Sequence, residues 1–213
     1  MIAESIRMKE DNACLLVIDV QLDFCPGGAL AIEQGDQVVP PINALINLFN
    51  NIVITQDWHP AGHSSFASSH EGSKPFSSVQ MPYGKQTLWP DHCIQNSSGA
   101  RFHPDLNSGA AQTIIRKGYH QDVDSYSAFF ENDGKTQTGL EGWLGTKQIN
   151  RLYLAGLATD FCVAYSAVDA ARLGFDVTVI LPACRAIDLE GTLNHQLSKM
   201  ADAGVTILDK FPE

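Results

Sequence analysis

The strongest constraint on the fold is a set of short apolar runs that alternate with longer helix-like segments. Most of these runs are continuously apolar, which is typical of strands buried on both faces of a parallel sheet. Six runs occur, at residues 14–20, 51–56, 113–116, 151–157, 175–181 and 205–208. Short apolar runs alone do not exclude buried helices, so the segments between them decide the interpretation.

Three intervening segments carry helix signals. A helix is predicted from Asp36, as its cap, to about Asn50, with two prolines in the first turn and an apolar stripe behind them. The alanine-rich segment 162–173 is followed by Gly174, and a segment from about 190 to 203 is followed by Gly204. Glycine is common just past the end of a helix.

Strands that alternate with helices of this length predict right-handed crossovers. The expected fold class is therefore α/β, with a doubly wound, mostly parallel sheet of about six strands and helices on both faces. A chain of 213 residues with 44% hydrophobic side chains fits a single domain, 1–213.

Charge and cysteine content restrict the function and the compartment. The formal charge of -10 comes without a Lys/Arg cluster, which argues against nucleic-acid or anionic-membrane partners and favours a small-molecule site. The first thirteen residues lack a continuous apolar segment, and no apolar run reaches membrane-spanning length, so a cytoplasmic location is predicted. Five scattered cysteines are expected to be reduced thiols.

Two long segments, 64–101 and 118–143, lack periodicity but are rich in aromatic residues and histidine, which favours ordered loops that build a site.

Four polar residues stand at or just past the ends of predicted strands: Asp19, Asp57, Lys117 and Cys162. Ligands bind at the carboxyl ends of the strands in open α/β sheets, so these four side chains are expected to share one crevice.

Cys162 stands where a strand leads into a helix, so backbone N–H groups at the helix start are expected to lower its pKa and to bind an oxyanion. A cysteine is more often a small buried hydrophobe, and that interpretation fits Cys14 and Cys184.

Asp19 is flanked by residues of a buried strand, so its carboxylate needs a partner such as Lys117 or will hold its proton. Taken alone, Asp19 fits a structural ion pair or turn cap equally well.

Asp57, His59 and His92 offer mixed oxygen and nitrogen donors that suit zinc, iron or manganese and leave open coordination positions. The alternative is that these histidines only form hydrogen bonds in a polar loop. The remaining histidines have no ligand-like spacing and are assigned no role: His70, His103, His120 and His195.

These residues lie in motifs that resemble bacterial nicotinamidases (pyrazinamidases) of the isochorismatase-like cysteine hydrolase superfamily. The resemblance runs nearly end to end, with several separated motifs in the same order. The motifs are DVQLDFC (19–25), QDWHPAGHSSF (56–66), WPDHC (89–93), RKG (116–118) and GLATDFCV (156–163).

The resemblance implies that Asp19, Lys117 and Cys162 form a catalytic triad. It also implies a cis peptide at Leu157-Ala158 and an oxyanion hole from the N–H groups of Ala158 and Cys162. The implied metal ligands are Asp57, His59 and His92, around one divalent ion, usually zinc or iron. Residues implied to surround a pyridine ring are Phe24, Trp89, Tyr126 and Ala158.

The implied reaction is hydrolysis of nicotinamide, and of pyrazinamide, through a Cys162 thioester in NAD salvage. Some members of the family use an additional protein ligand, for which His63 or Ser64 is the candidate here, and others use only water; both options and a homo-oligomer are left open. Three alternatives stand beside it: a hydrolase of the same superfamily acting on carbamoyl, ureido or enol-ether compounds, a catalytically silent binding domain, and a metallohydrolase in which Cys162 is only structural.

Overall fold

A computed structural model describes residues 8–211, so the first seven and last two residues of the predicted domain lie outside the described part. Six parallel strands form the main sheet in the order β5-β2-β1-β6-β7-β8. The strands are β1 Ala13–Ile18, β2 Asn51–Asp57, β5 Thr113–Lys117, β6 Arg151–Leu157, β7 Asp176–Arg185 and β8 Thr206–Leu208. The predicted α/β fold class is confirmed, and each strand lies within a few residues of its predicted range.

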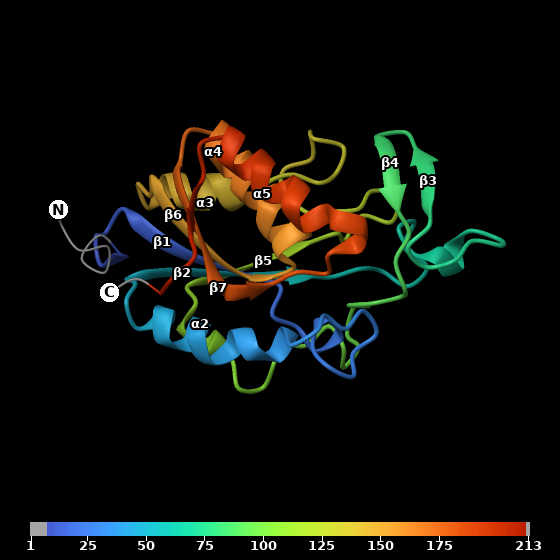
Figure 1. The fold of residues 1–213 in the computed structure, drawn as a ribbon, viewed down its shortest axis with the longest axis horizontal. Coiled ribbons are helices and arrows are strands. Elements are labelled where there is room, and N and C mark those ends of the chain that lie inside the picture. Colours follow the sequence, from blue (N-terminus) through green and yellow to red (C-terminus); the bar gives the residue numbers. More distant parts are fainter. Residues whose placement is uncertain (1–7, 212–213) are drawn as a thin grey trace.

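Helices cover both faces of this sheet. They are α2 Val39–Ile46, α3 Leu140–Thr146, α4 Ala164–Arg172 and α5 Thr192–Asp202. Figure 1 shows α2 on one face and α3, α4 and α5 on the other, as a doubly wound sheet requires. None of the helices in residues 8–211 combines the length and apolar character that crossing a membrane requires.

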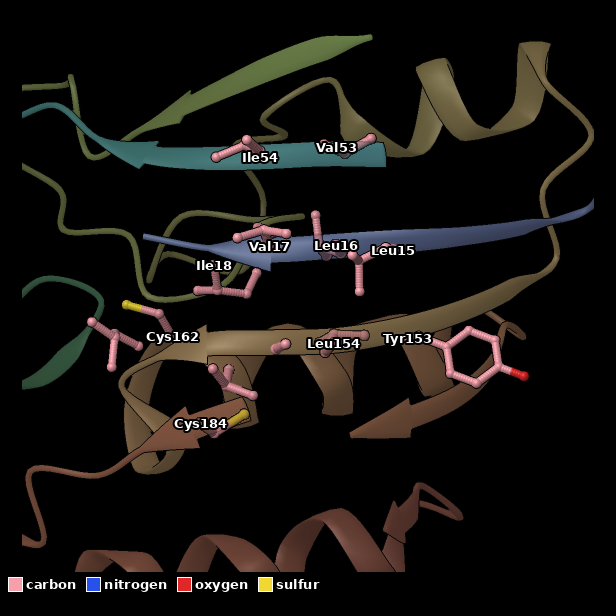
Figure 2. Close-up of a cluster of buried hydrophobic side chains, with 14 of the residues drawn as sticks. Leu15, Leu16, Val17, Ile18, Val53, Ile54, Tyr153, Leu154, Cys162 and Cys184 are labelled. Atoms are coloured by element: carbon pink, nitrogen blue, oxygen red, sulfur yellow. The ribbon is translucent and has the colours of Figure 1, made fainter. Parts of the chain in front are cut away.

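The core is built around β1, whose six residues are all buried. Figure 2 shows the side chains of Leu15, Leu16, Val17 and Ile18 between those of β2 and β6, with Cys162 beyond the carboxyl end of β6. Because neighbouring strands are parallel and in register, their last residues meet at one edge: Asp57 pairs with Lys117, and Ile18 pairs with Gly156.

Some predicted helix boundaries were wrong. Asp36 lies inside a short 3-10 helix, Gly35–Val38, and does not cap α2, which starts at Val39 and ends at Ile46 rather than near Asn50. The segment predicted as helix from Cys162 begins with a π-helical turn, Thr159–Val163, and becomes α-helical at Ala164. Gly174 and Gly204 follow α4 and α5 with φ values of 92° and 83°, as predicted.

The two segments predicted to lack periodicity contain elements that the sequence did not indicate. Residues 64–101 include an antiparallel hairpin, β3 Ser78–Met81 and β4 Gly84–Thr87, and α3 begins in the second segment. In Figure 1 this hairpin stands beyond one end of the main sheet. It is a separate two-stranded sheet.

Gly156 lies in β6 where this strand approaches β1 closely, so a substitution at this position tests the contact between the two strands. Its φ is 127°, and an added Cβ would overlap the carbonyl oxygen of Ile18. We expect Gly156→Ala to lower the free energy of unfolding by about 2–4 kcal/mol, because backbone strain and the overlap act together. Urea denaturation would measure the loss.

The matched control is Gly145→Ala in α3, where an added Cβ meets no atom within 4 Å. Alanine is a better helix former than glycine, so this variant should be neutral or more stable by up to about 1 kcal/mol. Equal stability of the two variants would contradict the proposed strand contact.

Candidate active site

The candidate site lies at the carboxyl edge of the sheet, where the winding direction of the chain reverses. Asp19 directly follows β1, Asp57 and Lys117 end β2 and β5, and Cys162 lies in the turn after β6. The strand order changes direction between β1 and β6, which is the position where open α/β sheets bind ligands. The four side chains that the sequence predicted to converge lie together there.

Lys117 is the centre of this cluster and is fully buried. Its Nζ atom lies 2.8 Å from Oδ2 of Asp19 and 2.8 Å from Oδ1 of Asp57. It also donates a hydrogen bond to the carbonyl of Ser125 at 2.8 Å and lies 3.4 Å from Sγ of Cys162. One ammonium group therefore holds two carboxylates, a loop carbonyl and the thiol in fixed positions.

Burial and the neighbouring charges shift the pKa values of Lys117, Asp57 and Asp19 in different directions. Burial alone would lower the pKa of Lys117, but Asp19 and Asp57 outweigh it and raise the pKa well above its usual value. Burial alone would raise the pKa of Asp57, but Lys117 and His59 lower it well below the ordinary range. For Asp19 burial dominates and raises the pKa, although Lys117 opposes it. Asp19 is thus the carboxylate better suited to accept a proton.

The Cys162 thiol sits in a tightly bonded turn. The Ala158 carbonyl accepts hydrogen bonds from the N–H groups of Phe161 and Val163, both at 3.1 Å, and the Ser166 hydroxyl donates to the Cys162 carbonyl at 2.6 Å. The peptide bond between Leu157 and Ala158 is cis, as the resemblance implies.

The thiol pKa differs in sign from the sequence-based expectation. Burial raises the pKa of Cys162 well above its usual value, Lys117 opposes this, and Asp19 and Asp57 add to it. The expected lowering by the helix start was therefore wrong, because desolvation exceeds it. At rest the sulfur carries its proton and needs a base.

Asp57, His59 and His92 form a second cluster, all buried, beside the first. Oδ2 of Asp57 lies 3.2 Å from Nε2 of His59 and 3.5 Å from Nε2 of His92. Each histidine directs its Nδ1 atom at a backbone carbonyl, that of Gly118 or Pro90, at 2.8 Å. Each Nδ1 atom is therefore placed to donate a hydrogen bond to a carbonyl, and both Nε2 atoms face the carboxylate of Asp57.

Two imidazole nitrogens and a carboxylate oxygen that face one another can hold a cation between them, either a proton or a metal ion. Burial alone would lower the pKa of His59, but the Asp57 charge raises it. The orientation of both imidazoles by backbone carbonyls is typical of metal-ligating histidines. The donor set therefore fits a divalent ion such as zinc or iron.

His63 behaves differently. Its Nδ1 atom accepts the N–H of Ser65 at 3.2 Å, and its Nε2 atom faces the carbonyls of His120 and Val123 at 2.9 and 3.2 Å. Both ring nitrogens of His63 thus have hydrogen-bond partners, but His63 also forms a group with His59 and Asp124 that could hold a metal ion, so the choice of an additional ligand stays open. Asp124 was missed by the sequence-based reasoning, yet it is buried and its Oδ1 atom lies 3.9 Å from Nε2 of His59.

A narrow, mostly apolar pocket leads to Cys162. The four predicted ring-binding residues line it: Phe24, Trp89, Tyr126 and Ala158. The sequence-based reasoning missed four others: Leu30, Asp124, Phe161 and Ile187. Phe161 stood inside a recognised motif and was available from it, whereas the other three lie outside the motifs and outside helices and strands.

Residues 13–210 match the isochorismatase domain family, so the chain belongs to the isochorismatase family. It is therefore a hydrolase, and its relatives identify it more narrowly as an amidohydrolase. Nicotinamidase of Acinetobacter baylyi is 52% identical over 94% of both chains, and that of Escherichia coli K12 is 44% identical over 91% of this chain and 92% of the relative.

Solved structures agree with this assignment. A nicotinamidase/pyrazinamidase from Acinetobacter baumanii superposes with a TM-score of 0.92 and 50% identity over 93% of this chain and 96% of that one. PnC1 from L. infantum, solved with nicotinate, has a TM-score of 0.82 and 36% identity over 94% of both chains. Pyrococcus horikoshii pyrazinamidase, solved with zinc, has a TM-score of 0.76 and 34% identity over 93% and 99%.

The state of the thiol can be measured by alkylation with iodoacetamide. Because the pKa of Cys162 is raised, its alkylation rate in the native protein should increase about tenfold per pH unit between pH 7 and 9 without a plateau. Mass spectrometry would locate the modification. In urea, all five cysteines should react as ordinary thiols and level off above about pH 8.5. A plateau below pH 7 in the native protein would instead indicate a preformed thiolate paired with Lys117.

Proposed function

We propose that this chain hydrolyses nicotinamide to nicotinate and ammonia, and that it also accepts pyrazinamide. The observation that carries the proposal is the contact of the Cys162 thiol with Lys117, which also binds Asp19, at the end of an aromatic pocket that borders the Asp57–His59–His92 cluster. The names of the relatives support the choice of substrate.

The pocket suits a flat heteroaromatic ring. Phe24, Trp89 and Tyr126 supply aromatic surface, and Phe161 adds an edge-on contact with Trp89 at a ring-centroid distance of 4.9 Å. Few polar groups interrupt this lining, so the ring can be bound by apolar burial while its carboxamide lies against Cys162.

Asp57, His59 and His92 would hold one divalent metal ion, zinc or iron, with manganese as the alternative. When bound, the ion would supply a Lewis-acidic anchor for the ring nitrogen of the substrate. The zinc complex of the P. horikoshii relative supports this assignment. The three side chains would also fix the distance between the ring and the thiol.

In the acylation step, Asp19 takes the proton of the Cys162 thiol while the sulfur attacks the amide carbon. The N–H groups of Ala158 and Cys162 bind the oxyanion that forms. Lys117 stays protonated and balances the negative charge of the carboxylates. The C–N bond then breaks, Asp19 returns its proton to the leaving nitrogen, and ammonia departs from a thioester.

In the deacylation step, Asp19 takes a proton from water, and the resulting hydroxide attacks the thioester carbon. The C–S bond breaks, the sulfur recovers a proton from Asp19, and nicotinic acid leaves and loses its proton to water as nicotinate. The acid product would enter NAD salvage. The cytoplasmic location, a homo-oligomeric state and the domain limits of 1–213 stay predictions.

Removing the sulfur tests the thioester mechanism. Cys162→Ala should reduce ammonia release from nicotinamide at least about 1000-fold, because no nucleophile remains to form the acyl-enzyme. Circular dichroism and metal analysis should match the parent protein. Cys14→Ala, a buried cysteine in β1, is the control and should keep its activity. Activity of Cys162→Ala within tenfold of the parent would favour the alternative in which Cys162 is only structural.

The metal cluster can be tested by removing one ligand or the ion. His92→Ala should lower the bound metal and raise KM for nicotinamide at least about tenfold, since the ring nitrogen loses its anchor. Chelation should have the same effect, and added zinc or iron should reverse it. His195→Ala, at an exposed position in α5, is the control. Unchanged kinetics in a verified metal-free sample would remove the metal from the scheme.

A further inference from the structure

Gln86 is a buried polar residue that no step above uses. It lies in β4 of the hairpin outside the main sheet, and only 1% of its surface is exposed. A polar side chain buried to this degree needs hydrogen-bond partners to offset its desolvation. Two of its partners, Asp124 and Tyr126, line the substrate pocket.

The Gln86 amide donates hydrogen bonds to two residues that line the pocket, Asp124 and Tyr126. Its Nε2 atom lies 2.7 Å from Oδ2 of Asp124 and 2.9 Å from the hydroxyl oxygen of Tyr126, with the Thr87 carbonyl at 2.7 Å. Three acceptors therefore surround the two hydrogens of this amide nitrogen. Both amide hydrogens are therefore committed to these neighbours.

The oxygen atom of the Gln86 amide contacts Tyr126 through Asn132. Oε1 of Gln86 accepts a hydrogen bond from Nδ2 of Asn132 at 3.1 Å, and Oδ1 of Asn132 accepts the backbone N–H of Tyr126 at 3.0 Å. Gln86 thus fixes Tyr126 at its hydroxyl directly and at its backbone through Asn132. A closed set of three hydrogen bonds leaves the tyrosine little freedom to rotate.

Tyr126 in turn fixes the aromatic lining. Its hydroxyl accepts the indole N–H of Trp89 at 3.2 Å, and the two rings meet at 79° with centroids 6.2 Å apart. Tyr126 also meets Phe161 at 72° and 5.5 Å. Movement of Tyr126 would therefore change the shape of the slot that receives the ring.

We propose that Gln86 is a positioning residue that sets the width of the ring-binding slot by holding Tyr126. The inference rests on the proposed function, because it assigns the slot to the pyridine or pyrazine ring of the substrate. Gln86 touches none of the triad side chains in the hydrogen bonds described for residues 8–211. It should therefore affect substrate binding and leave the chemical step unchanged.

The test is steady-state kinetics of Gln86→Ala with nicotinamide, with metal content and Tm measured on the same samples. Loss of one or two hydrogen bonds to Tyr126 should raise KM about three- to tenfold, with kcat within about twofold of the parent. Gln80→Ala is the matched control, because Gln80 is an exposed glutamine in the partner strand β3. It should leave KM and kcat unchanged.

A second pair of variants separates positioning from general support of the hairpin. If Gln86 acts through the Tyr126 hydroxyl, Gln86→Ala should add less than twofold to KM when Tyr126→Phe is already present. An unchanged KM in Gln86→Ala, full additivity with Tyr126→Phe, or a parallel fall of kcat and metal content would overturn the proposal.

Should Gln86→Ala fail to fold, Gln86→Met keeps the side-chain length without the amide and takes its place in all measurements. An inactive parent protein would count against the proposed function itself. An active parent with the outcomes above would count only against the role of Gln86.

Discussion

The buried ammonium group of Lys117 is the interaction on which the site depends. It lies 2.8 Å from one carboxylate on each side, and all three groups are removed from water. Two buried carboxylates at this spacing would repel each other, and one of them would hold a proton, without a cation between them. Because Asp57 pairs in register with Lys117 across β2 and β5, and Asp19 directly follows β1, the sheet itself sets these distances.

One cation shared by two carboxylates divides their roles. Asp57 also faces His59, so its pKa is lowered and it stays an anion suited to a metal ligand. Asp19 has Thr55 as its other close partner, a neutral hydroxyl that donates to Oδ1 at 2.6 Å, and its pKa is raised. The same lysine therefore leaves one carboxylate ready to bind a cation and the other ready to accept the proton of a thiol whose own pKa is also raised.

The sequence predicted the sheet and the convergence of the four strand-end residues because strands buried on both faces leave continuous apolar runs, and a polar residue at the end of such a run is conspicuous. The hairpin β3–β4 was missed because its residues, SVQM and GKQT, are mostly polar and only one of them, Gln86, is buried, so no apolar run marks it. The cap assigned to Asp36 was wrong because a 3-10 helix precedes α2. The sign of the Cys162 pKa shift was wrong because the sequence does not show how completely the fold excludes water there. The role of His63 depends on which carbonyls face its ring, which spacing does not reveal.

The reacting groups and the ring-binding residues are held in place by different interactions. The reacting groups stand on strand ends, where parallel pairing fixes them, whereas Trp89 and Tyr126 come from segments outside the main sheet. These segments are not paired with strands of the main sheet, so a buried network of side-chain amides fixes them instead. Gln86 and Asn132 connect the hairpin to the hydroxyl and the backbone of Tyr126. A half-satisfied buried network is costly, because each unpaired group loses its water without gaining a partner. Changes in these segments should therefore be tolerated only in combinations that keep every donor matched to an acceptor, so the ring slot is expected to vary as a unit while the triad does not.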